Sequence, residues 1–160
     1  MTIKVGDRLP EGKFGIMTKD GPGSVSTQDL FGGKKVVFFS VPGAFTPTCS
    51  NSHLPGYVKH AGEIKAKGVD TIACMSVNDV FVMDAWGKSA SVGEDMLMLA
   101  DGNGDWTRAL GLELDATGFG MGKRGQRFAL VANDGVVTQL NVENAGEFRV
   151  SSAEFVLGQL

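Results

Sequence analysis

The stretch KVVFFSVPGAFTPTCS, residues 35–50, predicts a buried strand that passes through a stiff turn into a helix. Its first six residues are mostly apolar, with β-branched and aromatic side chains, as in a buried strand. Proline and glycine follow, and residues 49–66 then repeat apolar side chains at the spacing of an amphipathic helix. Cys49 is therefore expected in the first turn of that helix. Backbone N–H groups there lack helical partners and the helix dipole favours an anion, so the position favours a reactive thiolate.

The rest of the chain alternates predicted strands and helices. An Asp-Gly-Pro-Gly turn signal at 20–23 predicts a hairpin over residues 13–26. Asn133-Asp134-Gly135 predicts a second hairpin near the end of the chain. The other expected elements are a helical turn at 27–31, strands at 69–77, 96–100, 127–132 and 136–142, a helix capped by Asn78 or Asp79 that runs to about 90, and a short helix at 104–110. This order predicts an α/β fold of the thioredoxin-like class, with a central mixed sheet, helices on both faces and an N-terminal hairpin.

Two positions carry helix signals of their own. Pro55 lies inside the helix predicted after Cys49 and is expected to kink it. Ser151 with Glu154 forms a capping box, which predicts a last helix over residues 152–160.

Length and composition indicate one globular domain spanning residues 1–160. The net charge of −3 gives no attraction to nucleic acid or to anionic membrane, and no apolar run approaches the ~20 residues of a transmembrane helix. The start of the chain lacks the apolar core of a signal peptide and reads as a mature N-terminus. Two cysteines are too few for a disulfide scaffold, so a reducing compartment is expected, either the cytoplasm or, after removal of a transit peptide, an organelle.

Pro42, Thr46 and Cys49 fill the pattern Pro-x-x-x-Thr-x-x-Cys, which resembles the peroxidatic motif of the peroxiredoxins. The longer string VPGAFTPTCS is similar to the type II, or fifth-class, subfamily, and the resemblance extends from residue 5 to the turn at residue 135. It implies a thioredoxin-like fold and a thiol peroxidase that reduces hydrogen peroxide and alkyl hydroperoxides. The Cys49 thiolate would become a sulfenic acid, without metal, haem or flavin. A free cysteine is also often a buried small hydrophobe, which is the alternative for Cys49.

Other site residues follow from the resemblance. The family carries an essential arginine at a strand start, and Arg127 matches it best; Arg124 is the rival, expected in the glycine-rich loop before it. Arg127 could instead be an ordinary surface arginine. Thr46 would place its hydroxyl beside the sulfur, although it could also cap the helix. Pro42 would shield the sulfur from bulk water.

Cys74 has two open interpretations. In the plant-like branch of the subfamily a second cysteine at this spacing is the resolving thiol, and Cys74 would then form a disulfide with Cys49. The alternative is a buried core cysteine. The resemblance also implies a homodimer, and regeneration by glutaredoxin with glutathione or by thioredoxin.

Other candidate functions have less support in the sequence. Cys49 with His53 could suggest a metal site or a cysteine hydrolase, but two ligands do not make a zinc site and no hydrolase motif accompanies them. Residues 120–125 fit Gly-x-Gly-x-x-Gly but precede a strand rather than a helix, which argues against a dinucleotide site. A peroxide sensor using Cys49 is the functional alternative, and turnover separates it from an enzyme. Phe45 and Phe119 could line the entrance for an alkyl peroxide or pack at a dimer contact, although such rings more often belong to the core.

Overall fold

The computed structural model describes residues 2–160. The first element along the chain is the predicted hairpin. Strands β1 (Lys13–Thr18) and β2 (Gly21–Ser26) pair in antiparallel register, joined at residues 19–20. The turn is tighter than the sequence indicates, since residues 21–23 pair as part of β2. Helix α1 (Thr27–Phe31) follows directly, and the Ser26 hydroxyl caps it by accepting from the Asp29 N–H.

Seven strands form one mixed sheet in the order β2-β1-β5-β4-β3-β8-β9. Strands β3 (Lys35–Ser40), β4 (Thr71–Ser76) and β5 (Leu97–Ala100) run parallel, while β8 (Phe128–Asn133) and β9 (Val136–Val142) are antiparallel additions. Five consecutive residues of both β3 and β4 are buried, as expected of parallel strands covered on two faces. The predicted mixed sheet is confirmed.

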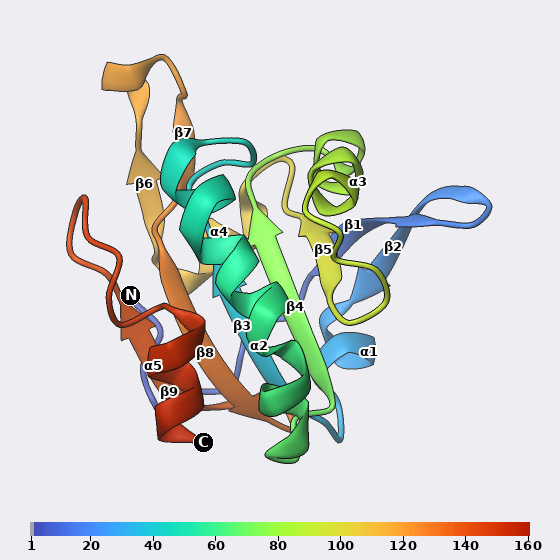
Figure 1. Cartoon of the computed structure of the whole chain (residues 1–160). Helices are drawn as coiled ribbons and strands as arrows, with labels where there is room; N and C mark the ends of the chain where they lie inside the picture. Colours follow the sequence, from blue (N-terminus) through green and yellow to red (C-terminus); the bar gives the residue numbers. More distant parts are fainter. Residues whose placement is uncertain (1) are drawn as a thin grey trace.

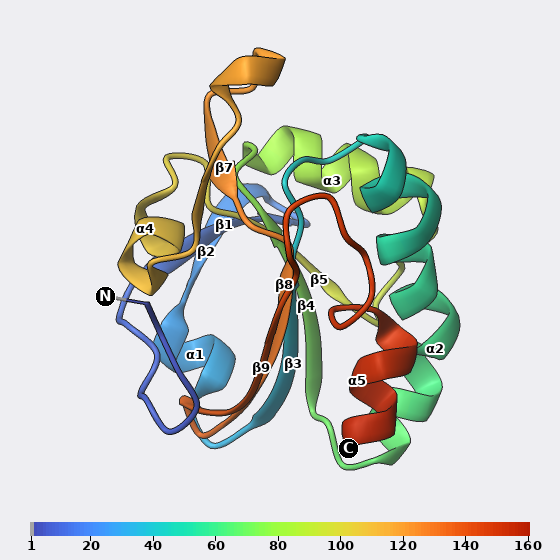
Figure 2. The ribbon, with the colours of Figure 1, turned by 90° about the vertical axis from the view of Figure 1, so that its left-hand side faces the viewer.

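Helices cover both faces of the sheet (Figures 1 and 2). On one side lie α2 (Leu54–Ala66), α3 (Val80–Ser89) and α5 (Ala153–Gln159). On the other side lie α1 and α4 (Asp105–Leu110), so that the sheet forms the middle of three layers. Each side has its own apolar core cluster, one beneath α2 and one around the Trp106 ring. No helix within residues 2–160 has the length and hydropathy to cross a membrane.

One hairpin was not predicted from the sequence. Strands β6 (Glu113–Asp115) and β7 (Lys123–Gly125) pair with each other and project from the upper end of the molecule, with a 3-10 turn at Thr117–Phe119 between them (Figure 1). Left-handed backbone at Gly120 and Gly122 reverses the chain here. Arg124 therefore lies on a strand, and its placement in a loop was wrong.

The last helix begins one residue later than the capping box indicates. Ser152 is its N-cap, because its hydroxyl accepts from the Phe155 N–H. The Ser151 hydroxyl instead donates to Glu143, 2.7 Å away. This exchange ties the start of α5 to the end of β9.

Candidate active site

The parallel strands β3 and β4 end at the same edge of the sheet, and the loop after each contributes to one site (Figure 1). The loop from β3 to Cys49 is held by the loop after β4, because the Ala44 N–H donates to Asn78 Oδ1 at 3.0 Å. Phe45 has a left-handed backbone, with φ of 64°, which is strained for an aromatic residue. The chain between strand and helix is thus fixed rather than loose.

Cys49 begins a π-helical turn, Cys49–His53, that leads directly into α2. The Leu54 N–H donates to the carbonyl of Cys49, five residues earlier, instead of to the fourth. The wider turn precedes Pro55, which has no N–H and cannot make the ordinary helical bond. The disturbance expected at Pro55 is therefore a wide turn upstream of it. Cys49 and His53 are fully buried, and such π turns are frequent at functional sites.

Arg127 reaches the Cys49 sulfur. It lies directly before β8, whose first residue, Phe128, pairs with Ser40 at the end of β3. This register brings the start of β8 beside the loop that leads to Cys49. Arg127 Nη2 donates to Cys49 Sγ at 3.0 Å, and Arg127 Nη1 lies 2.8 Å from His53 Nδ1. A fixed cation at this distance stabilises a thiolate.

Thr46 and Pro42 lie on the loop that precedes the sulfur. The Thr46 hydroxyl donates to the Gly43 carbonyl at 2.7 Å rather than capping the helix. The oxygen of that hydroxyl still has lone pairs, so it can accept a hydrogen bond from an O–H group of a ligand. Pro42 is half-buried. Arg124, the rival arginine, directs its hydrogen bonds to the carbonyls of Pro42 and Met121, at 3.3 and 2.9 Å, rather than to the sulfur.

His53 was missed as a site residue, because the sequence suggested only a metal or hydrolase role for it. Its Nε2 lies 3.0 Å from the carbonyl oxygen of Ser151, which also accepts from the Tyr57 hydroxyl at 2.7 Å. Burial, and then the charge of Arg127, lowers the pKa of His53 from 6.5 to about 3. The imidazole is therefore neutral at physiological pH, and the contacts join residues that lie far apart in sequence.

The buried imidazole predicts acid lability. Unfolding exposes His53, which then binds a proton below its ordinary pKa of 6.5, whereas the folded form resists protonation down to about 3. Stability is therefore complete above that ordinary value and is lost as the pH falls toward the folded value. Between about pH 7 and pH 5, the wild type should lose about 2 kcal/mol more unfolding free energy than His53→Asn. Urea titrations at both pH values measure this difference, and equal losses in the two proteins would contradict it.

Cys74 lies in the middle of β4, between Phe39 on β3 and Met98 on β5. It is fully buried in the same core cluster as Cys49. Burial, and then the nearby Cys49, raises the pKa of the Cys74 thiol well above its ordinary value. The two cysteines thus differ in kind: Cys49 has a cation against its sulfur, and Cys74 is held as a neutral thiol.

A pocket of about 410 Å³ opens beside Arg127. The Phe119 ring on the β6–β7 turn, which is 86% exposed, lines one part of this pocket, and the polar loop at 143–147 lines another. Phe45 is also 55% exposed, so the core interpretation is wrong for both Phe45 and Phe119. The residues lining the pocket are Pro42, Thr48, Leu114, Phe119, Gln126, Arg127 and the segment 143–147.

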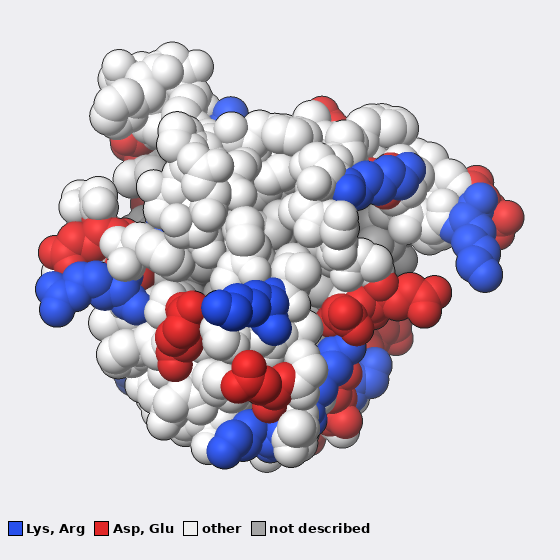
Figure 3. All heavy atoms as spheres, viewed as in Figure 1, with Lys and Arg blue, Asp and Glu red and all other residues white. Residues whose placement is uncertain are grey.

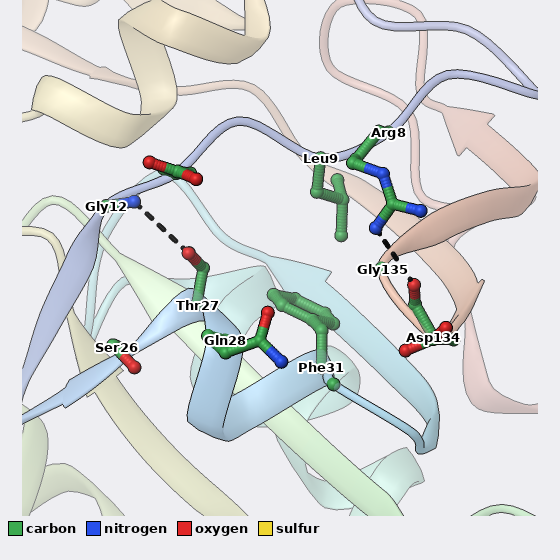
Figure 4. A pocket seen from close by; sticks show the side chains of 11 residues that line it. Arg8, Leu9, Gly12, Ser26, Thr27, Gln28, Phe31, Asp134 and Gly135 are labelled. Atoms are coloured by element: carbon green, nitrogen blue, oxygen red, sulfur yellow. Dashed lines mark hydrogen bonds between the residues drawn. The ribbon is translucent and has the colours of Figure 1, made fainter.

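A second pocket, of about 390 Å³, lies between α1 and the β8–β9 turn (Figure 4). Arg8 donates there to the Asp134 carbonyl, and Thr27 accepts from the Gly12 N–H. It is at the other end of β3 from Cys49, since Lys35 pairs with Asn133 next to that turn. The length of the strand, about 16 Å, separates it from the sulfur. It contains no cysteine or histidine and is not the site of the chemistry.

Within residues 2–160, no group of three or more histidine, cysteine, aspartate or glutamate side chains is placed to hold a metal ion. The glycine-rich run 120–125 turns into β7 and not into a helix, so it lacks the strand–turn–helix context of a dinucleotide site.

A buried cysteine on a helix start, an arginine against its sulfur and a thioredoxin-like sheet define a redox-active thiol protein. The family model for redoxins matches residues 4–157. Peroxiredoxin-2D of Arabidopsis thaliana is 51% identical over 99% of this chain and 98% of its own, and chloroplastic Peroxiredoxin-2E-2 of Oryza sativa is 52% identical over 99% of this chain and 73% of its own. The crystal structure of reduced Prx3 from Vibrio vulnificus with hydrogen peroxide is 53% identical, with a TM-score of 0.95 and 99% of both chains covered.

The chain belongs to the redoxin family and, within it, to the type II peroxiredoxins. It is a thiol-dependent peroxidase. The thioredoxin-like fold predicted from the sequence is confirmed by the same comparisons.

Proposed function

We propose that Cys49 is the peroxidatic cysteine, on the basis of the 3.0 Å contact between Arg127 and its sulfur. The thiolate attacks one oxygen of the hydroperoxide, and the O–O bond breaks. The attacked oxygen bonds to the sulfur and its proton passes to the leaving oxygen, which departs as water or an alcohol; the sulfenate left on the sulfur takes a proton from solvent to become a sulfenic acid. Peroxide consumption with a thiol reductant tests the proposal, and turnover distinguishes an enzyme from a sensor that reacts once.

The neighbouring side chains have separate roles in this proposal. Arg127 holds the thiolate and the peroxide, and stabilises charge on the leaving oxygen. The Thr46 hydroxyl, directed by its bond to Gly43, accepts a hydrogen bond from the peroxide O–H and so orients the peroxide. Pro42 walls the pocket next to Arg127 and limits the access of water.

The proposed substrates are hydrogen peroxide and alkyl hydroperoxides. Support for the first is the Vibrio vulnificus relative, which was solved with hydrogen peroxide bound. Support for the second is the pocket beside Arg127, since the side chains of Leu114 and Phe119 in its wall can contact an organic group. Rates with hydrogen peroxide and with an alkyl hydroperoxide, compared at equal enzyme, measure the range.

We propose that Cys74 resolves the sulfenic acid only when the reductant is a protein thiol. Cys74 is fully buried in a central strand, whereas a disulfide requires Cα atoms within about 7 Å and aligned Cβ atoms. The turn carrying Cys49 would have to unwind locally before the two sulfurs could bond. Glutathione needs only a small opening beside the buried Cys49, not the unwinding that would bring the two cysteines together.

Cys74→Ser should therefore retain activity with glutathione and glutaredoxin but lose most of it with thioredoxin. Peroxide consumption is measured with each reductant supplied separately. Mass spectrometry of the peroxide-treated wild type should show a Cys49–Cys74 disulfide. Equal activity of Cys74→Ser with both reductants, together with no such disulfide, would leave Cys74 as a plain core residue.

We also propose a homodimer that uses the end of the molecule around the site. Phe45, Phe81 and Phe119 are all more than half exposed there, on the loop before Cys49, the start of α3 and the β6–β7 turn. The same end carries few charged side chains (Figure 3), and exposed apolar patches mark interaction sites. Sedimentation velocity measures the assembly.

The two free thiols suit a reducing compartment, which we propose to be the cytoplasm or an organelle.

A further inference from the structure

The guanidinium of Arg127 is shared between two partners. Nη2 donates to the Cys49 sulfur at 3.0 Å, and Nη1 lies 2.8 Å from His53 Nδ1. A guanidinium is planar and rigid, so a bond that fixes one terminal nitrogen also fixes the other. The position of His53 therefore determines where the second nitrogen meets the sulfur.

The hydrogen bonds of His53 define its tautomer. Its Nε2 lies 3.0 Å from the Ser151 carbonyl oxygen, which can only accept, so Nε2 carries the proton. Nδ1 then has a free lone pair and accepts from Arg127, which is always a donor. A histidine protonated on both nitrogens could not accept this bond.

The imidazole is locked in place by its surroundings. The Phe39 and Phe148 rings lie 4.8 and 4.9 Å from its centroid. Phe148 also contacts Arg127, with the guanidinium carbon 5.9 Å from the ring centroid. The ring therefore cannot turn without displacing an aromatic neighbour.

The loop between β9 and α5 anchors the far end of this chain of contacts. Glu143 Oε2 accepts from the backbone N–H groups of Arg149 and Ser151, at 2.6 and 2.8 Å, and from the Ser151 hydroxyl. These bonds fix the Ser151 carbonyl that accepts the hydrogen bond from His53 Nε2–H. A carboxylate bound by several donors is a rigid anchor.

We propose that His53 is a positioning residue: its neutral Nε2–H form, anchored by the Glu143–Ser151 loop, orients Arg127 toward the Cys49 sulfur. The proposal rests on the roles proposed above for Cys49 and Arg127. Of the two bonds made by His53, the one from Arg127 to Nδ1 carries the effect on the reaction. The bond to Ser151 fixes the tautomer and holds the ring.

Two substitutions separate the ends of the imidazole. His53→Asn places Oδ1 where Nδ1 was and keeps an acceptor for Arg127. His53→Gln places an amide where Nε2 was and keeps the donor to Ser151. The rate of Cys49 oxidation by hydrogen peroxide should fall about tenfold in His53→Gln and by no more than about threefold in His53→Asn.

Tyr57→Phe is the matched control, because it removes the other hydrogen bond to the same Ser151 carbonyl and leaves the hydrogen-bonding groups of Arg127, His53 and Cys49 in place. Its oxidation rate, and the pH dependence of its thiolate absorbance, should stay at the wild-type value. In His53→Gln the thiolate absorbance should appear at higher pH. Equal rate losses in His53→Gln and His53→Asn, or in His53→Gln and Tyr57→Phe, would overturn the proposal. If Arg127→Gln is slow while His53→Gln is unaffected, the proposed role of His53 fails and that of Arg127 stands.

Discussion

Arg127→Gln should slow the reaction of Cys49 with hydrogen peroxide by about 10²–10³, the equivalent of roughly 2–4 kcal/mol in the transition state. The substitution removes the only charged donor hydrogen-bonded to the sulfur within residues 2–160. Negative charge moves from the sulfur to the leaving oxygen in this reaction, and a fixed cation in a partly buried site stabilises it more than water does. Stopped-flow measurement of Cys49 oxidation, followed by tryptophan fluorescence, gives the rate constant directly.

Arg124→Gln is the control, since it removes a neighbouring guanidinium of the same charge. Arg124 contacts the Pro42 and Met121 carbonyls, so its loss should loosen the loop and reduce the rate by less than about tenfold. The opposite ranking, with Arg124→Gln the slower variant, would mean that Arg127 does not play the role proposed for it. Comparable unfolding midpoints for the two variants would exclude a difference in folding.

The larger elements of the fold were predictable because their signals are local. Strands β3 and β4 are continuous apolar runs, and the N-terminal hairpin and the β8–β9 hairpin have turn residues between extended segments. The β6–β7 hairpin was missed for a physical reason. Its strands are three residues long and flank a glycine-rich turn, so neither periodicity nor strand propensity is visible over that span. The only sequence signal for the π turn is Pro55. Its missing N–H indicates that the helix is disturbed nearby, but it does not indicate that the disturbance is a π turn.

The candidate site divides in the same way. Pro42, Thr46 and Cys49 lie within eight residues, and their match to the peroxiredoxin motif marks the loop. Arg127 was predicted because the resemblance to the peroxiredoxins implies an essential arginine at a strand start, and the β3–β8 register places it at the sulfur.

The contacts of His53 with Arg127 and Ser151 span 74 and 98 residues and depend on tertiary packing. A histidine one turn after a cysteine is a signal that could have drawn attention to it. Nothing in the sequence near Glu143 indicates that its carboxylate anchors the Ser151 segment.

The most direct test of the central claim is to identify the sulfur that peroxide oxidises. The reduced protein is treated with one equivalent of hydrogen peroxide in the presence of a sulfenic-acid trap such as dimedone, and the adduct is located by mass spectrometry. The adduct should be on Cys49, and Cys49→Ser should give no adduct and no peroxide turnover, because the buried Cys74 thiol stays protonated. An adduct on Cys74, or turnover that survives in Cys49→Ser, would contradict the claim that Cys49 is the peroxidatic residue.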